Sequence, residues 1–270
     1  MKHLTPALAA ALTAWLQTPS QAHAQAGTEA QLAQQLSNPI ADLISLPLQL
    51  NYDENIGVAG EGSRYTLNVQ PVIPISLNAD WNVISRTIVP LTYQDDISPG
   101  AGSQEGLGDI LQSLFFSPKE PTANGWVWGV GPAFGLPTAT DELLGTEKWL
   151  LGPTAVALRV DGPLTYGALA NHLWSVAGTD ARSDVNQTFL QPFFAYTTPT
   201  AYTFTVNSES SYNWETEEWS IPINLLASKL VTIGKQPVSF ALGARYWADT
   251  PDTGAEDWGL RFVVTLIYPK

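Results

Sequence analysis

The chain has 270 residues, no cysteine, three histidines and a formal net charge of −13, from 12 Lys+Arg against 25 Asp+Glu. The lack of cysteine excludes a disulfide scaffold, a thiol nucleophile and thiolate metal ligands, and the acidic balance without a Lys/Arg patch argues against nucleic acid as a partner, because phosphate contacts need clustered cations. Two of the histidines, His3 and His23, lie in the first 24 residues, so we expect no transition-metal site and no cofactor.

Residues 1–24 have the pattern of a secretory signal peptide. Lys2 gives a basic start, an apolar run extends from Leu4 to Leu16, and the triplet Ala22-His23-Ala24 predicts cleavage before Gln25. The apolar run is too short to cross a bilayer as a helix, and no later segment approaches the roughly 18 to 20 apolar residues that such a helix needs. If the mature chain enters a membrane, it must therefore do so with strands.

Residues 25–44 form a separate N-terminal segment. The stretch from Thr28 to Ser37 has helical composition, a capping box of Thr28 with Gln31, and a stop at Asn38-Pro39. This pattern predicts a short polar helix or an irregular lead-in. Two places remain open for it: the periplasm, or the mouth of a barrel, where the segment would act as a plug.

From residue 45 to residue 270, alternating apolar and polar stretches are separated by breaks that are long and short in turn. The long breaks are acidic or rich in glycine, and the short ones are tight turns. Six long loops on one side and five short turns on the other predict twelve antiparallel strands, with both ends of this domain on the short-turn side. The expected strands cover residues 45–54, 64–77, 81–93, 107–117, 125–137, 148–160, 164–177, 187–197, 202–214, 219–233, 238–248 and 258–268. The predicted fold class is therefore all-β, a twelve-stranded antiparallel transmembrane β-barrel with a short N-terminal helical or irregular segment.

Alternation within these strands predicts one face for lipid and one face for water. In residues 64–77, Tyr65, Leu67 and Ile73 share one face, while Arg64 and Asn68 share the other. Tryptophans concentrate near the ends of the strands, as the two interfaces of a membrane favour. They are Trp81 and Trp126 beside short turns, and Trp149, Trp214, Trp219 and Trp258 beside long loops.

Several prolines fall inside the expected strands. They are Pro71, Pro74, Pro90, Pro132, Pro153, Pro192 and Pro222. Because proline has no ladder donor and a closed barrel has no edge strand to hold it, these positions predict bulges or kinks in the wall.

The candidate functional residues are the polar and charged side chains that alternation places on the inner face. They are Arg64, Arg86, Asp109, Glu209, Arg245 and Arg261, with Asn68 and Gln70 beside them. An isolated charge in a narrow lumen is unfavourable, so arginines and carboxylates should pair there. Two roles remain open: pairs that only fill the barrel, or a constriction that selects solutes by charge and size. Because eight strands leave a filled interior and sixteen leave an open channel, twelve predict a narrow or plugged cavity.

His172 is the only histidine outside the predicted signal peptide, so a lipid-active barrel enzyme with a catalytic histidine would have to use it. Such an enzyme needs a serine within hydrogen-bond reach of the histidine on the outer face. Alternation places His172 on the same face as Tyr166 and Trp174, whereas Ser175 faces the other way. The pattern favours an interfacial histidine and a protein that is not an enzyme.

Stretches spread over nearly the whole mature chain resemble an outer-membrane β-barrel family, the phenol meta-cleavage-pathway proteins, whose members are often labelled transporters. The stretches are NPIADLISLP (38–47), LNVQPVIPISLNADWNVISRTIVPL (67–91), GLGDI (106–110), FFSP (115–118), WGVGPAFGLPTATD (128–141), KWLLGPTAVAL (148–158), DVNQTFLQPFFAY (184–196), GKQPV (234–238) and DWGLRF (257–262). The resemblance implies a barrel fold and the transport of small, including aromatic, molecules. It brings no catalytic or binding motif.

These features predict an outer-membrane channel or facilitator for small solutes, including hydrophobic or aromatic compounds. Its expected place is a bacterial-type outer membrane, reached by export with a cleaved signal peptide, and its expected partners are outer-membrane lipid and the solutes themselves. Two alternatives remain: a barrel that transports nothing and serves as a structural or surface protein, and a lipid-active barrel enzyme.

Overall fold

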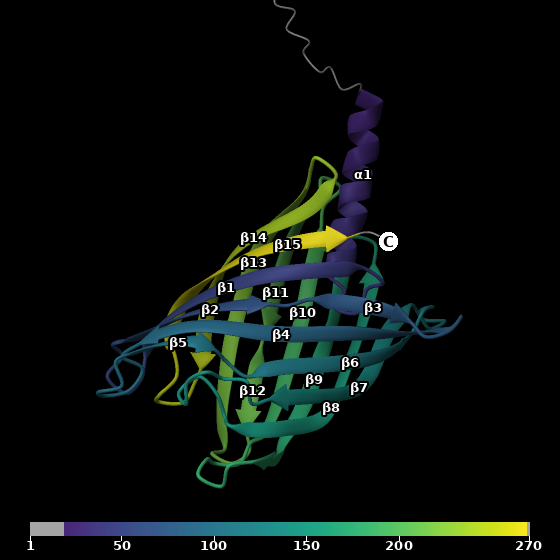
Figure 1. Cartoon of the computed structure of the whole chain (residues 1–270). Coiled ribbons are helices and arrows are strands. Elements are labelled where there is room, and N and C mark those ends of the chain that lie inside the picture. Colours follow the sequence, from purple (N-terminus) through teal and green to yellow (C-terminus); the bar gives the residue numbers. More distant parts are fainter. Residues whose placement is uncertain (1–18, 269–270) are drawn as a thin grey trace, which may run out of the picture.

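The computed structural model describes residues 19–268, with residues 19–26 described by their backbone alone. The chain forms one helix followed by a closed antiparallel barrel of twelve strands (Figure 1), and this confirms the predicted fold class. The elements are α1 (Pro19–Leu36), β1 (Ile44–Ile56), β2 (Gly62–Val69), β3 (Val72–Ser76), β4 (Trp81–Asp95), β5 (Ser103–Leu107), β6 (Ile110–Pro118), β7 (Trp126–Leu136), β8 (Lys148–Asp161), β9 (Leu164–Gly178), β10 (Asn186–Thr197), β11 (Tyr202–Ser208), β12 (Ser210–Asn213), β13 (Glu218–Ile233), β14 (Gln236–Asp249) and β15 (Asp257–Tyr268).

The ring closes between the first and the last strand. β1 pairs with β15 on one side and with β2 on the other, and Asn51 lies opposite Arg261 in the β1–β15 ladder. The remaining strands pair with their neighbours in chain order, and the β9–β10 ladder completes the circle. A closed ring leaves no free edge, so the backbone donors and acceptors of the strands find partners within the wall, as a bilayer requires.

Three of the twelve strands are each interrupted once, which divides them into β2 and β3, β5 and β6, and β11 and β12. A proline lies in or opposite each interruption. Pro71 separates β2 from β3, Pro90 of β4 faces the break before β6 and accepts a hydrogen bond from the Gly108 amide at 2.9 Å, and Pro222 of β13 accepts one from the Ser208 hydroxyl at 2.8 Å. The predicted irregularities are therefore confirmed at Pro71, Pro90 and Pro222, whereas the ladders run through Pro74, Pro132, Pro153 and Pro192 without a register shift, so the prediction was wrong there.

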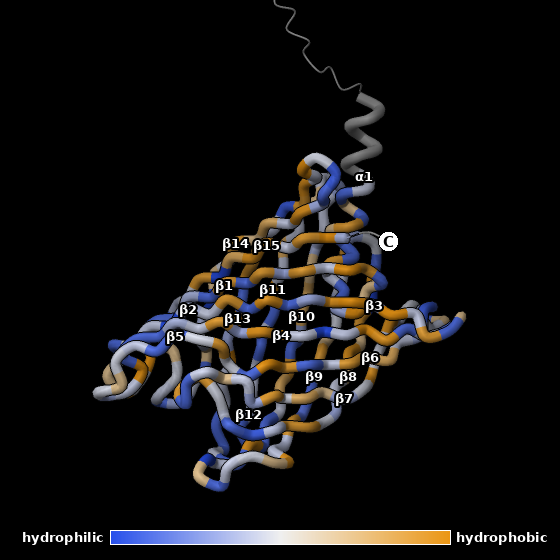
Figure 2. Tube along the Cα trace, in the orientation of Figure 1, coloured by the Kyte–Doolittle hydropathy of each residue, from blue (hydrophilic) through white to orange (hydrophobic). Residues whose placement is uncertain are grey.

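The alternation of the strands separates an apolar outer surface from a polar inner one. Tyr65, Phe204 and Leu260 are exposed on the outside, whereas Arg261, next to Leu260 in β15, is only 2% exposed. Figure 2 shows the same pattern as a change of colour along each strand. Exposed tryptophans mark both ends of the outer surface, at Trp126 near a short turn and at Trp149, Trp214, Trp219 and Trp258 near the long loops.

All the long loops lie at one end of the barrel and the short turns at the other, and α1 and the end of β15 are on the short-turn side (Figure 1). The helix begins at Pro19, nine residues before the predicted start at Thr28, and it ends at Leu36, just before the predicted stop at Asn38-Pro39. Residues 1–18 of the predicted signal peptide lie outside the described residues, so its cleavage stays a prediction. Between residues 19 and 268, no helix has the length and apolar character of a membrane span.

The chain from Ala30 to Leu43, hereafter the plug, enters the barrel from the short-turn end. Ile40 packs in a buried apolar cluster with Ile84 of β4, Phe115 of β6 and Leu158 of β8. A second buried cluster joins Ala33 and Leu43 of the plug to the inner wall, at Ala201, Leu230 and Ile267. Of the two places left open by the sequence, the structure shows the barrel mouth. The plug therefore adds apolar packing to this half of the interior, which simple alternation of apolar and polar residues does not predict.

Candidate functional site

The other half of the interior, toward the long loops, contains a central chamber of about 430 Å³. Its wall combines apolar side chains with side-chain amides, and the two kinds are interleaved on β9 and β10. The apolar residues are Ile88, Leu111, Leu169, Leu173 and Phe189, and the amides are those of Gln49, Asn68, Gln70, Asn171, Gln187 and Gln191. This volume lies within the roughly 300 to 1,000 Å³ that small-molecule pockets occupy.

Glu209 is the centre of the charged part of the chamber. It lies at the interruption between β11 and β12, and its two carboxylate oxygens accept hydrogen bonds from the Arg261 guanidinium at 2.9 and 2.6 Å. Arg261 also donates from Nε to Asn51 at 2.7 Å, and a second arginine, Arg245, has a terminal nitrogen 3.9 Å from Glu209. The fork geometry is the strongest arrangement available to an arginine and a carboxylate.

Asp53 of β1 holds Arg245 from the other side. Its carboxylate lies 3.3 Å from the Arg245 guanidinium and accepts a hydrogen bond from the Trp247 indole nitrogen at 2.9 Å. The Arg245 guanidinium stacks over the Trp247 ring, with 4.4 Å between its carbon and the ring centroid. Asp53 therefore pairs with Arg245, and Glu209 pairs with Arg261. Pairing between inner arginines and carboxylates is what the sequence predicted.

The two remaining inner arginines have only neutral partners. Arg64 donates from Nε to the Gln94 side chain at 2.8 Å, and Arg86 donates to the Gln70 side chain at 3.3 Å. Among the described residues, neither arginine has a carboxylate within the 4.0 Å of an ion pair. The inner charge cluster, defined as Asp53, Arg64, Arg86, Glu209, Arg245 and Arg261, therefore combines four cations with two anions, although the chain as a whole has a net charge of −13.

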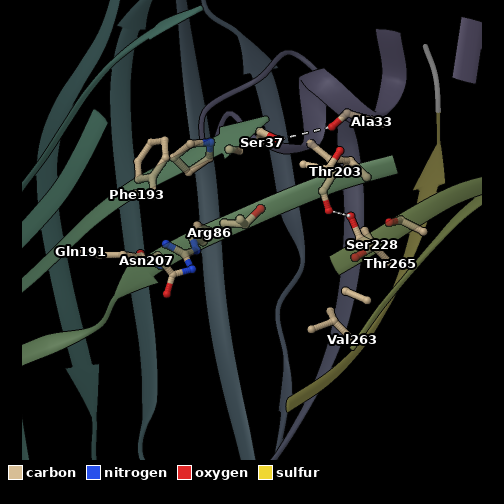
Figure 3. A pocket seen from close by; sticks show the side chains of 16 residues that line it. Ala33, Ser37, Arg86, Gln191, Phe193, Thr203, Asn207, Ser228, Val263 and Thr265 are labelled. Carbon is tan, nitrogen blue, oxygen red and sulfur yellow. Dashed lines mark hydrogen bonds between the residues drawn. The ribbon is translucent and has the colours of Figure 1, made fainter. Parts of the chain in front are cut away.

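Arg86 marks the boundary between the chamber and the half of the interior that the plug occupies. On the inner face of β4 it follows Ile84, which packs in the apolar cluster, and precedes Ile88, which lines the chamber. Two smaller cavities, of about 250 and 170 Å³, lie beside the plug, and Arg86 lines both of them as well as the chamber. Figure 3 shows Arg86 with Asn207 and Gln191 on one side of the 250 Å³ cavity and Thr203 on the opposite side.

The structure thus brings seven of the eight predicted site residues to the inner wall and places Asp109 elsewhere. Asn68 and Gln70 line the chamber with Arg86, Glu209 and Arg245. Asp109 lies at the break between β5 and β6, where its carboxylate accepts hydrogen bonds from the Ala139 amide at 3.2 Å and from the Thr146 amide at 2.7 Å. It holds the loop between β7 and β8 and is not part of the inner charge cluster.

Two members of the site escaped the sequence-based selection. Asp53 pairs with Arg245, and Trp247 stacks under it. Alternation along residues 45–54 would have found Asp53, because Gln49, Asn51 and Asp53 are spaced two apart and all face inward. Alternation also places Trp247 inward, because it lies two residues after Arg245, but its residue type favours the outer interface where the other tryptophans of the strand ends lie.

Groups that could hold a metal or act as a nucleophile are sparse. Within residues 19–268, no three His, Cys, Asp or Glu side chains gather around a common point. His172 lies on the outer face of β9, with its ring 4.2 Å from the Trp174 ring and its Nδ1 2.7 Å from the Thr188 hydroxyl oxygen. That oxygen also accepts the indole N–H of Trp214 at 2.8 Å. His172 is thus embedded among aromatic rings near the long loops.

Comparison with known proteins gives a clear likeness of fold. No family model matches the chain, and no curated protein matches it. Among solved structures, an outer membrane channel from Pseudomonas putida F1 superposes with a TM-score of 0.65 at 11% identity, covering 84% of this chain and 96% of the channel. The NanC porin superposes with a TM-score of 0.51 at 8% identity, covering 83% of this chain and 100% of the porin. At such identities the likeness supports the barrel fold alone.

Proposed function

We propose that the protein is an outer-membrane channel for small solutes, which pass through the central chamber and around the plug. The observation that carries this proposal is the polar, charge-lined chamber of about 430 Å³ inside a closed barrel whose outer surface is apolar. An outer surface of this kind requires lipid, and a chamber lined by amides and paired charges favours water and polar groups. The two similar structures, an outer membrane channel and a porin, support the same role.

In such a channel, the plug would select solutes by size and the inner charge cluster would select them by charge. Cavities of about 250 and 170 Å³ lie beside the plug, so the plug would limit the size of a solute. The cluster, with four arginines and two carboxylates, sets the charge preference, as rings of charged side chains do in other pores. The apolar part of the chamber wall, with Phe189 and Leu169, suits solutes that carry an aromatic or aliphatic group.

Conductance in planar bilayers tests the proposal. We expect small, discrete current steps from the purified protein, and swelling of protein-loaded liposomes in at least one of a panel of sugars, amino acids and phenols. Arg245→Gln should change the cation-to-anion preference, because Arg245 lines the chamber, whereas Arg159→Gln should not, because Arg159 lies outside the chamber beside Asp161. The absence of both current and swelling would refute the channel.

The same experiment decides the first alternative, a sealed structural barrel, which the apolar packing of Ile40 and Leu43 favours. The second alternative, a lipid-active enzyme, rests on the contact between His172 and the Thr188 hydroxyl. We propose that the protein is not an enzyme, because His172 Nε2 has no hydrogen-bond partner among the described residues, so no third group orients the ring as a general base requires. Lipid hydrolysis by the wild type that His172→Ala abolishes would contradict this proposal.

A further inference from the structure

Among the described residues, the chamber wall contains one guanidinium with no carboxylate within ion-pair distance, that of Arg86, and Glu209 attracts it only at longer range. Among the described residues, Gln70 is its hydrogen-bond partner, at 3.3 Å, and the interaction is with a neutral amide. Glu209 is the acidic residue of the chamber wall, and Arg261 already binds both of its oxygens. A guanidinium has five N–H donors in a planar fork, so Arg86 retains donors that face the cavities it lines.

The position of Arg86 distinguishes it from Arg64, the other inner arginine without an ion pair. Arg86 lines the chamber and both cavities beside the plug, so it lies at the point where these spaces meet. Arg64 lines none of the three, because Gln94 and Gln104 cover it in a chain of hydrogen bonds toward the long loops. A partly buried cation that faces a cavity is stabilised by an anion in that cavity.

The other residues of the chamber wall indicate what the uncharged part of such an anion would contact. Ile88 lies on β4, the strand of Arg86, and Leu111 lies on the neighbouring strand β6. Leu169 on β9 and Phe189 on β10 lie across the chamber from them. A ligand with several negative charges would be repelled by Glu209, whereas one with a single negative charge matches the single unpaired guanidinium. Carboxylates fit the planar fork of an arginine with two parallel hydrogen bonds.

We infer that the chamber binds small monocarboxylates with an apolar body, such as aromatic acids, and that Arg86 is the residue that binds the carboxylate. This inference rests on the proposed channel function and names the class of solute. The ring or chain of the acid would lie against Phe189, Leu169 and Ile88, and the carboxylate would lie beside Gln70, at the entrance to the cavities around the plug.

Isothermal titration of the folded protein in lipid nanodiscs tests this binding site with sodium benzoate and its neutral analogue benzamide. We expect benzoate to bind more tightly than benzamide, and Arg86→Gln to weaken benzoate binding by about tenfold to a hundredfold, the range for losing a hydrogen bond to a charged group. Arg159→Gln, the control, should leave benzoate affinity unchanged within about twofold, because Arg159 lies outside the chamber beside Asp161. Arg86→Lys keeps the charge and loses the fork, so its affinity should lie between those of the wild type and Arg86→Gln.

The possible outcomes separate this inference from the channel function. Equal binding of benzoate and benzamide, no benzoate binding, or unchanged benzoate affinity in an Arg86→Gln protein that retains heat-modifiable migration on gels would each overturn the carboxylate site. Benzoate binding that depends on Arg86, without current or liposome swelling, would support the site and reject the channel. Swelling with neutral solutes and no preference for benzoate would support the channel and reject the site.

Discussion

The two halves of the barrel interior are filled by different chemistry. Toward the short turns, Ile40 and Leu43 of the plug pack against aliphatic and aromatic side chains of the wall, and Phe115 there is fully buried. Toward the long loops, arginines, carboxylates and amides surround a chamber of about 430 Å³. The same twelve-stranded wall thus encloses apolar packing around the plug at one end and a chamber bordered by charges at the other, and Arg86 lies where they meet.

The difference shows how a barrel of intermediate width reaches stability. Twelve strands enclose more space than their own side chains fill. In the short-turn half, the plug supplies part of the missing apolar volume and leaves cavities of about 250 and 170 Å³ beside it. In the long-loop half, the space remains, and Arg245 and Glu209, which border it, are held by direct hydrogen bonds to Asp53 and Arg261. In the proposed channel, passage of a solute would depend on both halves, through the size of the cavities around the plug and the charge around the chamber.

The largest effect should come from a charge placed in the apolar cluster around Ile40 of the plug. Ile40→Asp removes packing worth about 2 to 5 kcal/mol. It also places a carboxylate among Ile84, Phe115 and Leu158, whose apolar side chains offer it no hydrogen bond and no opposite charge. We expect the plug to leave the barrel mouth and single-channel conductance to rise severalfold. Gln31→Asp, which adds the same charge on the exposed side of α1, should leave conductance at its wild-type value. Unchanged conductance in Ile40→Asp would mean that the plug does not limit passage.

In the long-loop half, Glu209→Gln should cause the next largest change. It leaves Arg261, which is 2% exposed, without its carboxylate partner. We expect a loss of about 3 kcal/mol in the free energy of unfolding, the lower end of the range for a broken buried pair, because Glu209 partly faces the chamber. The measurement is the temperature at which the folded gel band disappears. Adding Arg261→Met should restore much of the loss, and a larger loss in the double variant would contradict the pairing.

A smaller effect on stability and a clear effect on selectivity should follow from Asp53→Asn. The variant weakens the hydrogen bonds that Asp53 accepts from Arg245 and Trp247, at a cost of about 1.5 kcal/mol. It also removes one of the two anions of the inner charge cluster, so the reversal potential in a salt gradient should shift toward anions. Glu54→Gln is the matched control, because Glu54 is the next residue of β1 and is exposed. Equal shifts in both variants would show that selectivity does not arise inside the barrel.

The smallest effect should appear at the rim, outside both halves. Hydrogen bonds from Lys148 and from Ser175 hold the pKa of the Asp184 carboxyl below its usual value of 3.8. Because the pKa is lowered in the folded state, this contact stabilises the loop above pH 3.8 and is lost as the pH falls through the lowered value. We expect faster hydrogen exchange in residues 179–185 only in strong acid, and the same change at neutral pH in Asp184→Asn. Asp180→Asn, in the same exposed loop, should show no change, and a change in conductance over this pH range would contradict the separation of rim and interior.

Several features of the wall and of the site follow from local sequence patterns. The strand positions, the alternation of long and short connections and the irregularities at Pro71 and Pro222 all agree with the structure, because they depend on residues close together in the chain. Asp109 is instructive, since the break after β5 shifts the alternation. Gln104 faces inward before the break and Ser113 faces inward after it, so spacing across the break cannot tell which way Asp109 points.

The sequence by itself determined the barrel wall and the inner position of most of its charges, because side-chain direction in a strand alternates with a period of two. Only the tertiary structure decided what fills the ring. The position of the plug depends on how much volume twelve strands leave open. Arg245 pairs with Asp53, which is 192 residues away in the chain. The register around the closed ring decides which carboxylate reaches which arginine, so no local sequence pattern predicts that pair, or that Arg86 lacks an ion-pair partner.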